Sequence, residues 1–421
     1  MQAVEMKFPR CCGLDVHKRT VVAAIRIVDS NANLHEEVRT FATTTCGLLE
    51  LGDWLVELDV DKAAMESTGV YWKPVWNLLE GRSTRSGKRL ELMLVNARHV
   101  RNVPGRKTDV RDCQWIAQLL SGGLLSPSFV PPRPQRELRD LTRQRAQLIG
   151  DRSRAANRLQ KVLEDANIKL ASVASDVLGV SGRQMLRAII QDTMDAAQMA
   201  ELAKRKLRLK IPQLVEALSG RVTDHHRFML GSALDQIEHL ESEIKRFDQR
   251  IEQVMGPFEQ EAVRRLDQIP GFDRRAAQNV LAEIGTDMSR FPTAGHLGRW
   301  AGMAPGNNQS AGRRRSGRMT EGNRWLKRTL NQTAWAASRS KTSYFRSQHA
   351  RLARRRGAKR ATMAVGHSQL CTIYHMLQRG TAYADLGVDY FDHRNVQHER
   401  ERLISRLQRL GCKVTVESVA A

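Results

Sequence analysis

Residues 10–28, RCCGLDVHKRTVVAAIRIV, decide the fold of the first part of the chain. Their β-branched and apolar residues predict strands at Cys11–Val16 and Thr20–Val28. The polar residues DSNAN at 29–33 predict a turn, after which Glu37–Thr43 can pair back as a third strand. The stretch therefore predicts three antiparallel strands in succession.

The elements expected next alternate between helix and strand. They are helices at Gly47–Leu58 and Val70–Leu79, the second interrupted by Pro74, strands at Lys62–Ser67 and Leu90–Val95, and a helix after Asp109. Three antiparallel strands followed by helix, strand, helix, strand and helix is the element order of an RNase H-like domain. We therefore expect an α/β RNase H-like domain over residues 1–130.

The middle of the chain has the pattern of long helices. A proline-rich segment, residues 131–134, predicts a stiff linker before them. Apolar residues then recur in heptads over Leu138–Val162, where Arg145 and Arg152 interrupt the seam. They recur without interruption over Leu230–Val254. We expect two helical arms that pair as a coiled coil, with each other or with a second protomer, and a polar helical stretch between them.

The composition excludes several classes of protein. The 421 residues carry a formal net charge of +23, and a hydrophobic fraction of 41% argues against a disordered chain. No apolar run approaches the roughly 20 residues of a membrane-spanning helix, and charged residues stand among the first ten positions. The six cysteines form no C-x-x-C pair. We expect a cytoplasmic protein with reduced thiols, neither secreted nor membrane-bound.

Positive charge is concentrated in one segment. Residues 299–360 contain 17 Lys or Arg and one acid, interleaved with tryptophan and other aromatic residues. Basic side chains bind phosphates by releasing counterions, and aromatic rings stack on unpaired bases. One arginine triplet alone could be a solvated helix face, but this excess predicts a nucleic-acid-binding segment. Its expected contact residues are Arg313, Arg314, Arg315, Arg318, Arg354, Arg355 and Arg356.

Four carboxylates of the first domain stand at positions suited to metal-dependent chemistry. Asp15 ends the first strand, Glu66 ends the fourth, and Asp109 and Asp112 lie on one face of the following helix. An RNase H-like sheet places its first and fourth strands side by side. Because clustered acids repel unless cations neutralise them, we expect two Mg²⁺ ions that activate phosphodiester bonds. Taken singly, each acid is more simply a surface charge, or for Asp109 a helix cap.

A second candidate centre lies beside the first arginine triplet. Within PGNNQSAG, residues 305–312, Ser310 stands between glycines and ahead of arginines. Such a serine could attack phosphorus while arginine stabilises the charge on the phosphate. Serine in a Gly/Asn loop is more often a turn residue, and Ser316 is a rival for the same role.

These motifs together resemble those of DEDD insertion-sequence transposases. The acidic motifs are GLDVHK at 13–18, MESTG at 65–69 and KTDVRD at 107–112, and the later ones are DHHRF at 224–228, IPG at 269–271, APGNNQSAG at 304–312 and GN at 322–323. The resemblance covers about residues 10–390.

The resemblance implies both an architecture and a reaction. The implied parts are a RuvC-like domain over 1–130, a coiled-coil domain over 131–262, a mostly helical C-terminal transposase domain over 263–385 and a charged tail over 386–421. The implied protein is a bacterial recombinase, associated with the nucleoid when active, that acts on donor and target DNA as a dimer or tetramer. A bridge RNA guides it. The metal-binding acids are then Asp15, Glu66, Asp109 and Asp112, and Ser310 forms a serine–DNA intermediate with the aid of Mg²⁺.

Two other functions fit part of the pattern. A RuvC-like, metal-dependent Holliday-junction nuclease would use the carboxylates and water and would need no serine. A structural nucleic-acid-binding protein would need the basic segment but not four acids. Substitution of Asp15 separates the binding protein from the two enzymes, and substitution of Ser310 separates the recombinase from the nuclease.

Overall fold

The fold is described from a computed structural model of the chain. The structure describes residues 7–29, 33–66, 69–96, 109–305, 308–310, 313–316, 319, 321–393 and 396–415. At 109–111, 308–310, 313–316, 392–393 and 396–399 it describes the backbone alone. The chain divides into two compact units, Met1–Pro131 and Pro132–Ala421. Each is described by itself.

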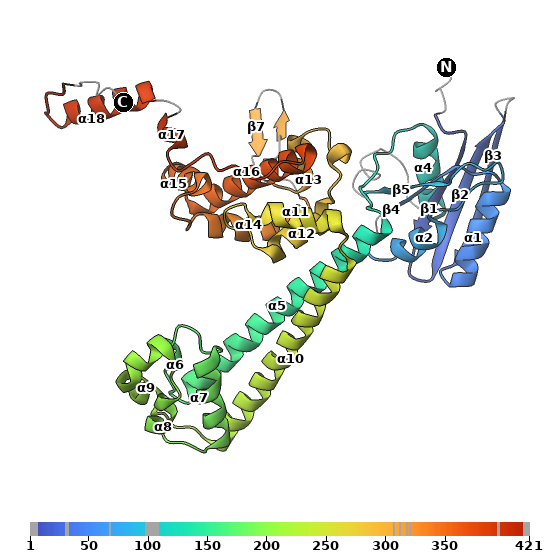
Figure 1. The fold of residues 1–421 in the computed structure, drawn as a ribbon. Helices are drawn as coiled ribbons and strands as arrows, with labels where there is room; N and C mark the ends of the chain where they lie inside the picture. Colours follow the sequence, from blue (N-terminus) through green and yellow to red (C-terminus); the bar gives the residue numbers. More distant parts are fainter. Residues whose placement is uncertain are drawn as a thin grey trace. The chain divides into compact units, whose positions relative to one another are not determined.

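The first unit contains a five-stranded mixed sheet (Figure 1). Its strands are β1 (Arg10–Val16), β2 (Thr20–Val28), β3 (Leu34–Ala42), β4 (Lys62–Glu66) and β5 (Glu91–Val95). The order is β3-β2-β1-β4-β5, with β1 antiparallel to β2 and parallel to β4. The five predicted strands are confirmed, the third beginning three residues earlier than expected. A mixed sheet with this order is compatible with an RNase H-like domain.

Helices cover both faces of the sheet (Figure 1). They are α1 (Thr45–Glu57), α2 (Trp72–Leu79) and α4 (Asp109–Ser121). Leu14 and Met65 belong to the core under α1 and α2, whereas Cys11 and Ala64 pack with α4. The expected interruption at Pro74 is wrong, because this proline lies in the first turn of α2, where its missing N–H costs no helical hydrogen bond.

A glycine sets the distance between α4 and the sheet. A Cβ added to Gly13 of β1 would overlap the backbone carbonyl oxygen of Cys113 and lie 2.5 Å from the backbone nitrogen of Ala117. The thiol of Cys11 lies 3.5 Å from the carbonyl oxygen of Ala117. The helix backbone therefore rests directly on β1, with its N-terminal end toward Asp15.

We expect Gly13→Ala to destabilise the first unit by about 2 kcal/mol, the scale of overpacking a close contact. Urea unfolding followed by the fluorescence of Trp54 and Trp76, both buried in this unit, measures the loss. Gly122→Ala is the matched control, since its Cβ would meet no atom closer than 3.6 Å. Equal stability of the two variants would show that α4 can move away from the sheet without cost.

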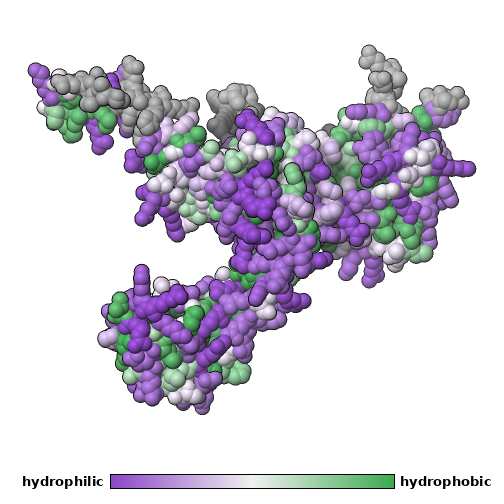
Figure 2. Space-filling model, in the orientation of Figure 1, coloured by the Kyte–Doolittle hydropathy of each residue, from purple (hydrophilic) through white to green (hydrophobic). Residues whose placement is uncertain are grey.

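Two long helices form the arm of the second unit. These are α5 (Arg133–Asp165) and α10 (Asp224–Val254), which pack along each other within one chain (Figure 1). Figure 2 shows hydrophilic side chains over the outer surface of this pair. The expected proline linker is wrong in its extent, because α5 already begins at Arg133 and Pro134 occupies its first turn.

The heptad residues of α10 are largely buried against neighbours in the same chain. Leu230, Ile237 and Ile251 are fully buried. Dimerisation through these heptads and a coiled-coil geometry stay predictions. The expected imperfection at Arg145 has a structural reason: its buried guanidinium binds Asp248 of α10 at 2.9 Å and Gln278 at 2.6 Å. Arg152 likewise pairs with Glu241 at 2.8 Å.

Small helices fill the stretch between the arms. They are α6 (Leu170–Val173), α7 (Val180–Gln191), α8 (Ala196–Glu201), the 3₁₀ helix η1 (Arg205–Lys210) and α9 (Ile211–Leu218). The expected helical stretch is confirmed. It is not polar throughout, because Met185, Ala200 and Leu214 form a buried core with Leu159 of α5 and Leu234 of α10.

The rest of the second unit is mostly helical. Its helices are α11 (Pro257–Asp267), α12 (Arg274–Ile284), η2 (Met288–Arg290), α13 (Ala294–Trp300), α14 (Arg324–Ala337), α15 (Tyr344–Arg356), α16 (Ala358–Arg379), α17 (Tyr390–His393) and α18 (Val396–Arg409). The helices α11 through α16 and the first turns of α5 share one hydrophobic core. The strands β6 (Asn308–Ser310) and β7 (Arg313–Ser316) form a separate two-stranded sheet. In the described part of the chain, no helix is long and apolar enough to cross a membrane.

Candidate nucleic-acid-processing site

The first two predicted acids lie together at one edge of the sheet. The parallel register pairs Gly13 with Ala64 and Leu14 with Met65, so Asp15 and Glu66 are the next residues of adjacent strands. Side chains alternate between the two faces of a sheet. Because Leu14 and Met65 face α1 and α2, Asp15 and Glu66 face the opposite side, where α4 lies.

The two remaining predicted acids, Asp109 and Asp112, belong to the start of α4. Its first turn begins at Asp109 and lies at the same end of β1 as Asp15. Burial raises the pKa of the Cys113 thiol to about 11, and the charges of Asp15 and Asp112 add to the rise. The charges of both carboxylates therefore act on one buried sulfur. The N-terminal end of a helix also carries a partial positive charge, which favours acids at this position.

One contact residue was missed from the sequence. The Nε2 of His17 lies 3.1 Å from a carboxylate oxygen of Asp15, and the His17 side chain is half exposed. His17 stands two residues after Asp15, a spacing that puts both on one face of an extended chain. That spacing was the available signal.

Metal binding by these acids stays a prediction. Among the residues with described side chains, no group of three or more His, Cys, Asp or Glu is arranged to hold a metal ion. The side chain of Asp109 lies outside the described residues. The structure thus brings Asp15, Glu66 and Asp112 to one region, and the place of the Asp109 carboxylate stays a prediction.

Ser310 lies at the end of a β-hairpin in the second unit. Ser310 of β6 pairs with Arg313 of β7, so it is the last paired residue before the turn. The rival Ser316 pairs with Asn308 at the other end of the hairpin. The backbone bridge between Pro305 and Met319 closes the hairpin at its base. The side chains of Ser310 and of Arg313–Arg315, and the whole of Arg318, lie outside the described residues.

The second arginine triplet lies at an exposed corner. Arg354, Arg355 and Arg356 end α15, and Gly357, with φ +82°, turns the chain into α16. All three side chains are exposed, and none makes an ion pair in the described part of the chain. Cations at the C-terminal end of a helix are stabilised by its dipole. The corner therefore presents three exposed positive charges to solvent.

We expect Arg354→Gln, Arg355→Gln and Arg356→Gln together to weaken nucleic-acid binding and to reduce the slope of log K against log salt by roughly 2 to 3 units. Fluorescence anisotropy at several salt concentrations measures the slope. The matched control replaces Arg154, Arg187 and Arg246, which are exposed but paired with Asp151, Glu238 and Glu243, and should leave the slope unchanged. An unchanged slope in the first variant would place the binding surface elsewhere.

Comparison with known proteins gives the family. The DEDD transposase domain of IS110-type elements, described as "Transposase", matches residues 12–168, which contain all four predicted acids. A second family, "Transposase IS116/IS110/IS902 family", matches residues 263–350, which contain Ser310. Together the two matches cover more than half of the chain. The chain belongs to the IS110 family of transposases.

A curated relative has the same family name. The "Insertion element IS110 uncharacterized 43.6 kDa protein" of Streptomyces coelicolor is 33% identical over 124 residues. The match covers 28% of this chain and 29% of that relative, so the chain spans less than a third of its length.

A buried polar cluster of this IS110-family chain was also missed from the sequence. Glu283 of α12 binds Arg139 and Arg143 of α5 and Asn323 before α14. Burial lowers the pKa of Arg139 to about 10, and the charge of Glu283 opposes this effect. The spacing of these residues in sequence gives no sign of their contact, although Gly322-Asn323 is one of the segments that resembles the family's motifs.

Proposed function

We propose that this protein is a DNA transposase that excises and inserts an insertion sequence. It acts as a site-specific recombinase that cuts and rejoins donor and target DNA through a serine–DNA intermediate, and a bridge RNA guides it to its sites. The observation that carries the proposal is the pairing of β1 with β4, which puts Asp15 and Glu66 side by side on the face covered by α4.

The donor set of this edge fits Mg²⁺. Carboxylate oxygens are the ligands that Mg²⁺ prefers, and Asp15, Glu66 and Asp112 supply them from three elements. With Asp109 as a further ligand, a metal ion bound there would stabilise negative charge and activate the scissile phosphodiester. Gly13 keeps α4 close enough to β1 for the acids to act together.

Ser310 supplies the nucleophile in this proposal. The serine Oγ attacks phosphorus, a DNA hydroxyl leaves, and the serine–DNA ester keeps the free energy of the phosphodiester for rejoining. Arginines 313–315 follow the serine directly and would stabilise the negative charge on the phosphate. The acids lie in the first unit and Ser310 in the second. The proposed reaction takes the two half-sites from different protomers.

Reconstitution tests the proposal. Purified protein is incubated with Mg²⁺, donor and target DNA and RNA transcribed from the sequence that flanks the gene, and junctions are amplified and sequenced. We expect joined junctions that require the RNA. Cut ends without joined junctions would favour the junction nuclease, and bound but uncut DNA would favour a structural binding protein.

A further inference from the structure

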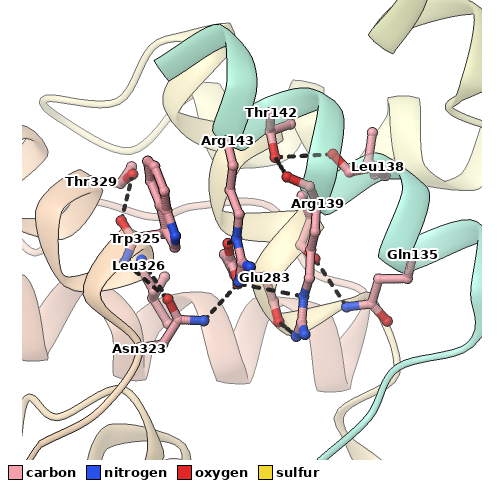
Figure 3. Close-up of polar contacts among 11 residues, drawn as sticks. Gln135, Leu138, Arg139, Thr142, Arg143, Glu283, Asn323, Trp325, Leu326 and Thr329 are labelled. Carbon is pink, nitrogen blue, oxygen red and sulfur yellow. Dashed lines mark hydrogen bonds and ion pairs between the residues drawn. The ribbon is translucent and has the colours of Figure 1, made fainter. Parts of the chain in front are cut away.

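Glu283 is a buried carboxylate held by two arginines. Its side chain is only 3% exposed. Arg143 donates from Nε to Oε1 at 2.7 Å and from Nη2 to Oε2 at 2.8 Å, and Arg139 Nε lies 3.4 Å from Oε2 (Figure 3). Arg139 also donates to the backbone carbonyl of Ala282 at 3.0 Å. Two arginines of α5 thus hold the carboxylate of Glu283.

Asn323 connects this carboxylate to the start of α14. Its Nδ2 donates to Glu283 Oε2 at 2.6 Å (Figure 3). Its Oδ1 accepts from the backbone N–H groups of Trp325 and Leu326 at 3.0 and 3.1 Å and so caps the helix. The two ends of one amide group therefore bind two different elements, which fixes the position of the chain at residue 323.

The residue before Asn323 is fixed as well. A Cβ added to Gly322 would overlap the backbone nitrogen of Gly302, just after α13. The Asn323 backbone N–H lies 3.4 Å from the carbonyl oxygen of Trp300. Residues 322–323 are therefore held against the chain that enters the hairpin at Pro305, and the Pro305–Met319 bridge lies between this anchor and the strands.

We propose that Glu283 and Asn323 are positioning residues that anchor the base of the β6–β7 hairpin and so hold Ser310 in place for attack on DNA. The inference rests on the proposed function of Ser310. A simple N-cap would need only the contacts of Asn323 to Trp325 and Leu326. The buried ionic partner goes beyond capping, because it ties the hairpin base to α5 and α12 together.

A pH profile separates positioning from general stability. In Asn323→Asp the introduced carboxylate keeps the cap but faces Glu283, and two carboxylates in contact cannot both ionise without repulsion. Among the described residues, Arg139 and Arg143 contact Glu283, and Asp140 and Arg290 act on the charge of Arg139. Arg328 lines the same pocket as Glu283. At low pH the carboxylates at positions 323 and 283 share one proton, which restores the hydrogen bond between them. As the pH rises this proton is lost, and the hydrogen bond is lost with it.

The measured quantity is the rate at which the protein forms its covalent complex with DNA. At each pH the rate of the wild type is divided by the rate of the variant. We expect a ratio near 1 at pH ~5.5 and of roughly 10 to 100 at pH ~8.5 for Asn323→Asp. Asn323→Ser keeps a capping oxygen and loses the Glu283 contact, so its ratio should be raised equally at every pH. Binding of RNA and DNA should change in neither variant.

A double variant makes the test two-sided. In Glu283→Gln with Asn323→Asp, the amide at 283 can donate to the carboxylate at 323, and the pair again carries one negative charge. The amide nitrogen cannot accept the hydrogen bond that Arg143 Nη2 donates to Oε2 of Glu283, so this contact is lost. We expect a ratio without pH dependence, because no second carboxylate faces the one at 323. A pH-independent ratio for Asn323→Asp, or a pH-dependent ratio for the double variant, would overturn the inference. Absence of any covalent complex in the wild type would instead refute the proposed function.

Discussion

Ser310→Ala should abolish the covalent attachment of DNA to the protein while leaving RNA and DNA binding in place. Removal of a catalytic nucleophile lowers a rate by roughly 1,000-fold or more, because no other group takes its position. Denaturing gels of reactions stopped with detergent show the attachment as a shifted DNA band that protease removes. This band should be missing in the variant at every time point.

Ser316→Ala is the matched control for this experiment. Ser316 pairs with Asn308, at the end of the hairpin away from its turn, so its loss should leave the shifted band intact. A band that persists in Ser310→Ala and vanishes in Ser316→Ala would show that the rival serine is the nucleophile. A band that never forms would favour hydrolysis by a junction nuclease.

Asp15→Asn combined with Glu66→Gln should abolish strand cleavage and exchange, by roughly 1,000-fold or more, with nucleic-acid binding retained or tighter. The reason is that two neutral amides no longer attract the metal whose charge stabilises the transition state. Cleavage of labelled donor DNA at several Mg²⁺ concentrations measures the loss, and anisotropy measures binding. Full recombination by this double variant would contradict the proposed catalytic edge.

The same strands supply a control. Asp61 and Glu91 lie at the start of β4 and β5, at the opposite end of the sheet from Glu66. They pair with Lys88 and Lys62. Asp61→Asn with Glu91→Gln removes the same charge from the same sheet and should leave cleavage within about threefold of wild type, since surface ion pairs contribute little.

The strands of the first unit were predictable because local composition is enough to define them. Thr20–Val28 is dense in β-branched residues, and the structure gives the strand with these same bounds. The expectations for two prolines are wrong for the same physical reason. Pro74 was expected to interrupt a helix and Pro134 to belong to a linker, yet each lies in the first turn of a helix, where proline is tolerated.

The buried arginines were not predictable from heptad spacing. Arg145 looks like a defect in an apolar seam, and its acceptors Asp248 and Gln278 stand more than 100 residues away. Glu283 stands 140 residues from its partner Arg143 of α5, and Asn323 stands 40 residues from Glu283. Long-range polar pairing depends on how helices pack, and periodicity within one helix carries no information on it.

The candidate site was predictable in part. Asp15 lies next to the end of β1 and Glu66 ends β4, two strands whose adjacency follows from the element order, and the observed register brings the two acids together. Asp112 joins them through α4, a packing that depends on Gly13 having no side chain. The contact with His17 was missed, because motif spacing gives a shared face but not a distance.

Mass spectrometry of the covalent complex tests the central claim most directly. After digestion with nuclease and trypsin, the peptide 300–313, WAGMAPGNNQSAGR, contains Ser310 as its only hydroxyl side chain, and Ser316 falls in the separate peptide 316–318. We predict that peptide 300–313 carries the mass of a nucleotide remnant, with fragment ions that place it on Ser310. A remnant on peptide 316–318 or on any other residue, with peptide 300–313 unmodified, would contradict the account.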